Sequence, residues 1–112
     1  MGWVYLLGDW EKEGIYKIGV TRGDVEKRIK KLQTGNSGEI YLVSKYDTKH
    51  PFLMENMLHT WYGNKRVMNE WFELNHEDIT TFLNKCEEIE GILETMEDNY
   101  YFKKKYGTTA KK

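Results

Sequence analysis

The chain is poor in the residues that would cross-link it or anchor it in a membrane. Its 112 residues include one cysteine, one proline and three histidines, with no long hydrophobic run. Cys86 has no partner for an internal disulfide, and we recognise neither a signal peptide nor an apolar segment long enough to span a bilayer. A single cysteine and widely spaced histidines also disfavour a closed structural zinc site. We therefore expect a cytoplasmic protein that does not associate with membranes.

The chain also lacks an excess of either charge. It has 17 Lys and Arg against 18 Asp and Glu, which argues against a protein that coats nucleic acid over its whole surface. The charges are nevertheless segregated. Residues 75–99 carry acidic side chains against Lys85 alone, whereas residues 14–36 are locally cationic. A polyanion would be drawn to particular faces of this protein.

The cationic stretch predicts a strand, a tight turn and a basic helix. Val25, Ile29 and Leu32 repeat at i, i+4 and i+7, and Asp24 is a suitable N-cap. Arg28 lies at the margin of this apolar stripe, where its guanidinium could be directed along the sheet and grip a phosphate through two hydrogen bonds. An ordinary rim residue and a solvated lysine face remain the alternatives. The candidate phosphate-binding residues are Lys17, Arg22, Lys27, Arg28, Lys30 and Lys31.

Three segments have the composition of strands, at residues 3–7, 15–20 and 39–46. Alternation places Val4 and Leu6 on one face of the first strand and Tyr5 on the opposite face, with Trp3 and Leu7. In the second strand, residues 16, 18 and 20 form a buried side and leave Lys17 and Gly19 on the other. Tyr5 and Lys17 can therefore share a surface.

A second helix is predicted to begin at Pro51, with Met54, Leu58 and Trp61 as its apolar positions. Glu55 and His59 are four residues apart on its flank. They form either part of a site or an exposed pair that stabilises the helix by a few tenths of a kcal/mol.

The rest of the chain reads as a short extended piece and a long helix. Residues 69–74 are aromatic and most simply plug the core. A nearly heptad stripe then predicts a helix from about His76 toward Lys105, within an extension at 76–106 that packs on the core or on a partner. We expect residues 107–112 to be a flexible tail. The stripe comprises Ile79, Phe82 or Leu83, Cys86, Ile89, Leu93, Met96 and Tyr100.

The ordered set of these segments resembles the GIY-YIG nuclease superfamily, specifically its phage-associated branch with a Lys-Ile-Gly second motif. The matching pieces are Val4-Tyr5-Leu6, Lys17-Ile18-Gly19, Glu26-Lys27-Arg28, Glu55 with Leu58-His59, and Glu70-Trp71-Phe72. In this resemblance Tyr5, and not the literal Gly-Ile-Tyr at 14–16, takes the place of the first tyrosine. Lys17 stands where the second tyrosine is usual, and Leu32 stands where some homing members carry a histidine.

The resemblance implies an α+β fold, with a small three-stranded antiparallel sheet flanked by helices and a core at residues 1–75. It also implies hydrolysis of a DNA phosphodiester with Mg²⁺, for which Mn²⁺ may substitute. In this scheme Glu55 holds the metal and Arg28 stabilises charge on the phosphoryl oxygens. Tyr5 takes a proton from the attacking water, and Lys17 lowers its pKa. His59 relays a proton, contacts phosphate or supports Glu55, and Gly19 leaves space for the substrate backbone.

The sequence thus predicts a metal-dependent DNA endonuclease, phage or mobile-element encoded, in the cytoplasm of a bacterium or a phage-infected host. The alternative is a catalytically inactive nucleic-acid-binding module on the same fold, and a third hypothesis is an interaction protein that uses the acidic helix. One domain of this length has no room for a sizeable recognition domain. A homodimer or a separate DNA-recognition module is therefore a candidate partner.

Overall fold

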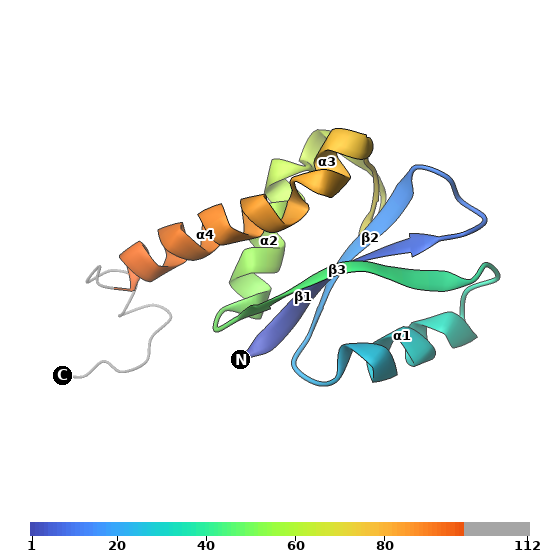
Figure 1. The fold of residues 1–112 in the computed structure, drawn as a ribbon, viewed down its shortest axis with the longest axis horizontal. Helices are drawn as coiled ribbons and strands as arrows, with labels where there is room; N and C mark the ends of the chain where they lie inside the picture. Colours follow the sequence, from blue (N-terminus) through green and yellow to red (C-terminus); the bar gives the residue numbers. More distant parts are fainter. Residues whose placement is uncertain (98–112) are drawn as a thin grey trace.

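The computed structural model describes residues 1–97 (Figure 1). Predictions on residues 98–112, including the end of the long helix and the tail, lie outside the described part. The elements, in chain order, are β1 (Gly2–Asp9), β2 (Ile15–Thr21), α1 (Val25–Thr34), β3 (Ile40–Thr48), α2 (Pro51–Trp61), the 3₁₀ turn η1 (Gly63–Lys65), β4 (Arg66–Met68), β5 (Trp71–Glu73), α3 (His76–Thr80) and α4 (Phe82–Met96).

The sheet has five antiparallel strands in the order β3-β1-β2-β5-β4, so the prediction of a three-stranded sheet is wrong. Of the two added strands, β5 lies in the segment 69–74 that the sequence assigned to a core plug, and β4 immediately precedes that segment. Trp71–Glu73 pairs with the first half of β2, and β4 pairs with β5. Three-residue strands are too short to show the alternation from which strands are recognised. The fold class is still α+β.

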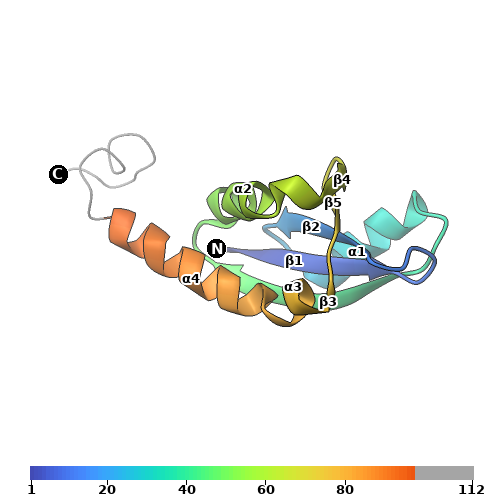
Figure 2. The same ribbon diagram turned by 90° about the horizontal axis from the view of Figure 1, so that it is seen from above.

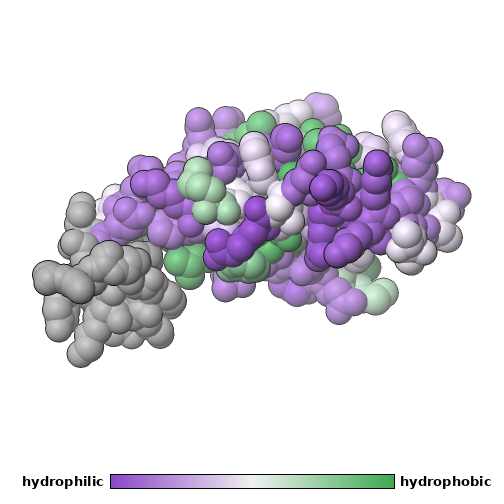
Figure 3. All heavy atoms as spheres, turned by 90° about the horizontal axis from the view of Figure 1, so that it is seen from below, coloured by the Kyte–Doolittle hydropathy of each residue, from purple (hydrophilic) through white to green (hydrophobic). Residues whose placement is uncertain are grey.

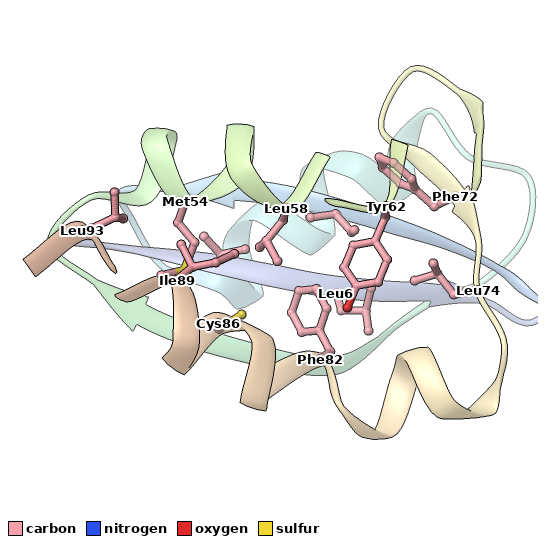
Figure 4. Close-up of a cluster of buried hydrophobic side chains, with 12 residues drawn as sticks. Leu6, Met54, Leu58, Tyr62, Phe72, Leu74, Phe82, Cys86, Ile89 and Leu93 are labelled. Atoms are coloured by element: carbon pink, nitrogen blue, oxygen red, sulfur yellow. The ribbon is translucent and has the colours of Figure 1, made fainter. Parts of the chain in front are cut away.

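Helices cover both faces of the sheet (Figures 1 and 2). α1 lies on one face, and α2, α3 and α4 lie on the other. Val4, Leu6 and Ile18 point into the larger core beneath α2 and α4, which also contains Met54 and Phe82 (Figure 4). The alternation predicted for the first two strands is confirmed by this arrangement.

A smaller core lies beneath α1. Tyr5 and Leu7 of β1 pack there against Val25, with Ile29 and Leu32 partly buried beside them. Asp24 caps the helix, because its side chain accepts a hydrogen bond from the Glu26 N–H. The predicted apolar stripe and N-cap of this helix are both confirmed, and together they fix which side of α1 faces the solvent.

The predicted long helix is interrupted at Thr81. A capping box between Asn75 and Asp78 starts α3, which ends after five residues, and α4 begins at Phe82. The side chains of Phe82 and Cys86 enter the larger core, as do Ile89 and Leu93 further along α4. The acidic outer face of α4 is thus carried on a helix whose inner face belongs to the main core.

Trp61, predicted as an apolar core position of α2, is instead 60% exposed. The ammonium of Lys85 lies over its ring, 3.4 Å from the ring centroid. The helix reaches its last turn at Trp61, where the neighbouring Tyr62 fills the core in its place.

Within residues 1–97, no helix combines the length and apolarity needed to cross a bilayer.

Candidate functional site

Tyr5 is the central side chain of the candidate site. It lies in the middle of β1 with only 1% of its surface exposed, opposite Gly19 in the β1–β2 ladder. A Cβ at Gly19 would lie 2.6 Å from the Tyr5 hydroxyl oxygen and ring edge. The space at Gly19 is therefore filled by the tyrosine ring. The expectation that this glycine makes room for the substrate backbone is wrong.

Arg28 meets Tyr5 as the sequence predicts. Its Nε donates a hydrogen bond to the Tyr5 hydroxyl oxygen over 3.3 Å, which joins the fourth residue of α1 to the sheet beneath it. Among the hydrogen bonds of residues 1–97, none uses the terminal guanidinium nitrogens of Arg28. Because this side chain is also largely exposed, its terminal nitrogens can bind an anion while Nε holds the phenol.

Burial raises the pKa of Tyr5 above its usual value of 10.0. The hydrogen bond and charge of Arg28 lower the pKa, whereas the charges of Glu70 and Glu55 raise it further. Among the largest influences on this pKa, Arg28 is the cation that favours the phenolate. The effect of Lys17 on the Tyr5 pKa stays a prediction.

Glu55 reaches the site from the opposite layer. α2 lies along the outer side of β2 (Figure 2), and His59 binds the Ile18 carbonyl through Nε2 over 3.0 Å. The same nitrogen is 3.9 Å from Glu55 Oε2. His59 therefore fixes α2 against the strand edge that β5 leaves free, which favours the supporting role among the three considered for it.

The Glu55 carboxylate is buried, and within the described chain its Oε2 has no hydrogen-bond partner. The pKa of this carboxyl is raised to about 7, chiefly by burial and also by the neighbouring carboxylate of Glu70, while Lys17 and Arg28 oppose the shift. A buried oxygen without a donor is suited to a cation. Since no group of three or more His, Cys, Asp or Glu among residues 1–97 could hold a metal, an ion here would keep most of its waters.

Glu70 is the residue that sequence reasoning missed. It belongs to a quoted motif, yet no role was assigned to it. Its carboxylate forms an ion pair with Lys17 over 3.0 Å, and its backbone carbonyl accepts a hydrogen bond from the Ile18 N–H. The ion pair holds the Lys17 ammonium beside Glu70, where it also lowers the pKa of Glu55. Only the pairing of β5 with β2, invisible in the sequence, could have revealed it.

The predicted DNA-binding residues divide into two groups. Lys27, Lys30 and Lys31 are exposed on the outer side of α1, where Figure 3 shows a broad hydrophilic area. Arg22 lies instead over the Phe52 ring, 5.1 Å from its centroid. The structure therefore places the helix lysines on the same layer as Arg28 but does not gather all six cations at one point.

Taken together, the fold and the site define a small α+β domain with cations on one layer, a buried carboxylate from the other, and a phenol held between them. Residues 2–87 match the T5orf172 domain model. The chain belongs to this family, a phage-associated domain related to nuclease folds. The match supports the phage-associated resemblance without establishing the GIY-YIG superfamily itself.

One relative is a viral protein without an assigned activity. The chain is 32% identical over 79 residues to a protein described as "Uncharacterized protein 460R" from Invertebrate iridescent virus 6. The aligned region covers 67% of this chain and 36% of that protein, so the chain spans about a third of its relative's length. No solved structure matches the chain.

Proposed function

We propose that this protein is a metal-dependent DNA endonuclease of the GIY-YIG type. The observation that carries the proposal is the hydrogen bond between Tyr5 and Arg28 near Glu55, whose buried Oε2 has no hydrogen-bond partner within residues 1–97. A phenol, a guanidinium and a carboxylate from separate elements have no structural need to converge. Membership of a family related to nucleases supports this reading.

Each side chain has a defined task in the proposed hydrolysis. The terminal nitrogens of Arg28 bind the scissile phosphate, and its Nε stabilises the phenolate of Tyr5. Tyr5 accepts a proton from the attacking water at its hydroxyl oxygen. Lys17, held by Glu70, adds positive charge beside the phosphate. His59 keeps Glu55 in place through its bond to the Ile18 carbonyl.

The residues present fit a single Mg²⁺ or Mn²⁺. Glu55 would hold the ion through its buried oxygen, with Glu70 beside it, and water and phosphate would complete the shell. When bound, such an ion supplies charge neutralisation at the phosphate and favours ionisation of nearby groups. Binding also has a readout apart from cleavage. Mg²⁺ should raise the Tm of the wild type and leave that of Glu55→Gln unchanged.

A second function, nucleic-acid binding without cleavage, is favoured by one observation. Tyr5 is 1% exposed and burial raises its pKa, so at neutral pH the free protein holds a neutral phenol with little access to water. A domain that only binds DNA would use Arg28 and the α1 lysines in the same way. The two functions differ in whether they require the Glu55 carboxylate.

A plasmid-nicking assay separates the two functions. Wild-type protein with Mg²⁺ or Mn²⁺ should nick supercoiled plasmid, and Glu55→Gln should abolish nicking. We expect Arg28→Ala to lower the rate roughly 100- to 1,000-fold. Glu88→Gln is the matched control, because Glu88 pairs with Lys85 on α4, away from the site. Binding of DNA by a wild type that nicks with neither metal would establish the binding module instead.

A further inference from the structure

A hollow of about 330 Å³ lies beside the candidate site, on the α1 side of the sheet. The proposed hydrolysis makes no use of it except through Lys17, which belongs to both. Its volume is at the lower end of small-molecule sites, which is enough for one nucleotide. The lining includes Lys17, Lys31, Leu32, Asn36, Ile40 and Trp71.

Trp71 gives this hollow an aromatic wall. It pairs with Lys17 across the β2–β5 ladder, so both side chains point to the α1 side of the sheet. The indole is half-buried. Its centroid lies 5.3 Å from the Lys12 ammonium and 5.5 Å from the Lys17 ammonium. An aromatic ring surrounded by cations is the combination that proteins use to hold unpaired nucleotides.

The other lining residues suit the same ligand. Leu32 and Ile40 contribute apolar surface for a base, and Lys31 contributes an exposed ammonium for its phosphate. The side chain of Lys12 is exposed and flexible, so its ammonium can leave the Trp71 ring and bind a phosphate instead. A base within a duplex has both faces covered by its neighbours, so only an unstacked base can offer a face to Trp71.

We propose that this hollow binds one unpaired nucleotide of a DNA strand, next to the phosphate at Arg28, with its base stacked on Trp71. The position of that phosphate rests on the proposed function. The substrate class implied is DNA with an unpaired stretch, such as a single strand, a flap or a branched junction. Continuous duplex would leave the hollow unfilled.

Binding to single strands with and without bases tests this proposal. The probe is a fluorescent 12-nucleotide strand and its abasic counterpart with the same phosphates, titrated without divalent cation so that no cleavage occurs. Wild-type protein should bind the abasic strand roughly 5- to 150-fold more weakly. Trp71→Ala should lose a similar factor on the normal strand and nothing more on the abasic strand, while Trp71→Phe keeps most of the affinity. Trp61→Ala is the matched control, since Trp61 is an exposed tryptophan on α2 outside the hollow's lining.

Equal binding of the two strands by the wild type would overturn the proposal. So would an equal loss on both strands in Trp71→Ala, because the indole would then only support the fold, or tighter binding of duplex than of single strand. Base-dependent binding by a protein that never nicks plasmid would keep this inference and reject the nuclease. Nicking without base dependence would do the reverse.

Discussion

Gly19 and Tyr5 show how closely the site is packed at the residue scale. Any side chain at position 19 must displace the ring of Tyr5, since its Cβ would come within 2.6 Å of that ring. We expect Gly19→Ala to lower the free energy of unfolding by about 1–3 kcal/mol and to disturb the bond to Arg28. Chemical denaturation measures the first effect. Gly63→Ala, where a Cβ has open space, should leave stability nearly unchanged, and equal stability of both variants would contradict this packing.

Glu55 makes stability depend on pH. Its pKa is about 7 in the folded protein and near 4.5 when the chain is unfolded, so the folded state holds a proton that the unfolded state loses between these values. The raised pKa therefore contributes stability below pH 4.5 that is lost as the pH rises through 7. Relative to the wild type, Glu55→Gln should become more stable by up to about 3 kcal/mol between pH 4.5 and pH 8.

Thermal unfolding of both proteins across this pH range measures the difference. Glu88→Gln serves as control, because Glu88 is exposed and pairs with Lys85 at the surface. A pH-independent difference between Glu55→Gln and the wild type would contradict this prediction, because it would mean that folding leaves the pKa of Glu55 unchanged.

The sequence predicted the Tyr5–Arg28 meeting but neither the role of Glu70 nor the pKa of Tyr5. Strand alternation and helix periodicity place a residue on a face, and this suffices for two side chains on the same layer. The partner of Lys17 depends on which strand lies next to β2, and the Tyr5 pKa depends on burial. Both are set by packing between segments distant in the chain.

At the scale of the elements, patterns long enough to repeat were predicted well. The stripes of α1 and the alternation of β1 and β2 are confirmed because each spans at least seven residues. The three short elements were predicted less well: β4 was not predicted, β5 was read as an extended core plug without a partner strand, and α3 was read as the start of one long helix. For such short pieces the neighbouring strand or a capping box decides the structure, and periodicity carries little information.

α4 offers a stabilising change at this scale. Gly91 lies in the interior of the helix, is exposed, and a Cβ there would meet nothing within 4 Å. Since glycine loses more backbone entropy than alanine in a helix, Gly91→Ala should stabilise the protein by about 0.5–1 kcal/mol. Urea denaturation measures the gain. A loss of stability would indicate that α4 is not helical at this position in solution.

For the whole molecule, the distribution of charge predicts how salt would affect the proposed binding of DNA. The lysines of α1 and the acids of α4 lie on opposite layers, so DNA should approach from the α1 side. If Lys27, Lys30 and Lys31 each neutralise a phosphate, replacing all three by alanine should reduce the slope of log K against log salt by about 2 to 3. Lys85→Ala, on α4, should leave the slope unchanged. The same slope for the triple variant and the wild type would mean that these lysines face only solvent.

The shortness of β5 has a consequence for the domain as a whole. Its ladder with β2 ends at Lys17, and just beyond it His59 takes the carbonyl of Ile18. Tyr5 packs in the core beneath α1 and Glu55 belongs to α2 in the opposite layer, so the two layers can share a site only beyond the end of this ladder. An insertion that lengthened β5 by two residues would place backbone between the Tyr5 phenol and the Glu55 carboxylate. Relatives with a longer β5 should therefore have lost any activity that needs Tyr5 and Glu55 together, even where both side chains are retained.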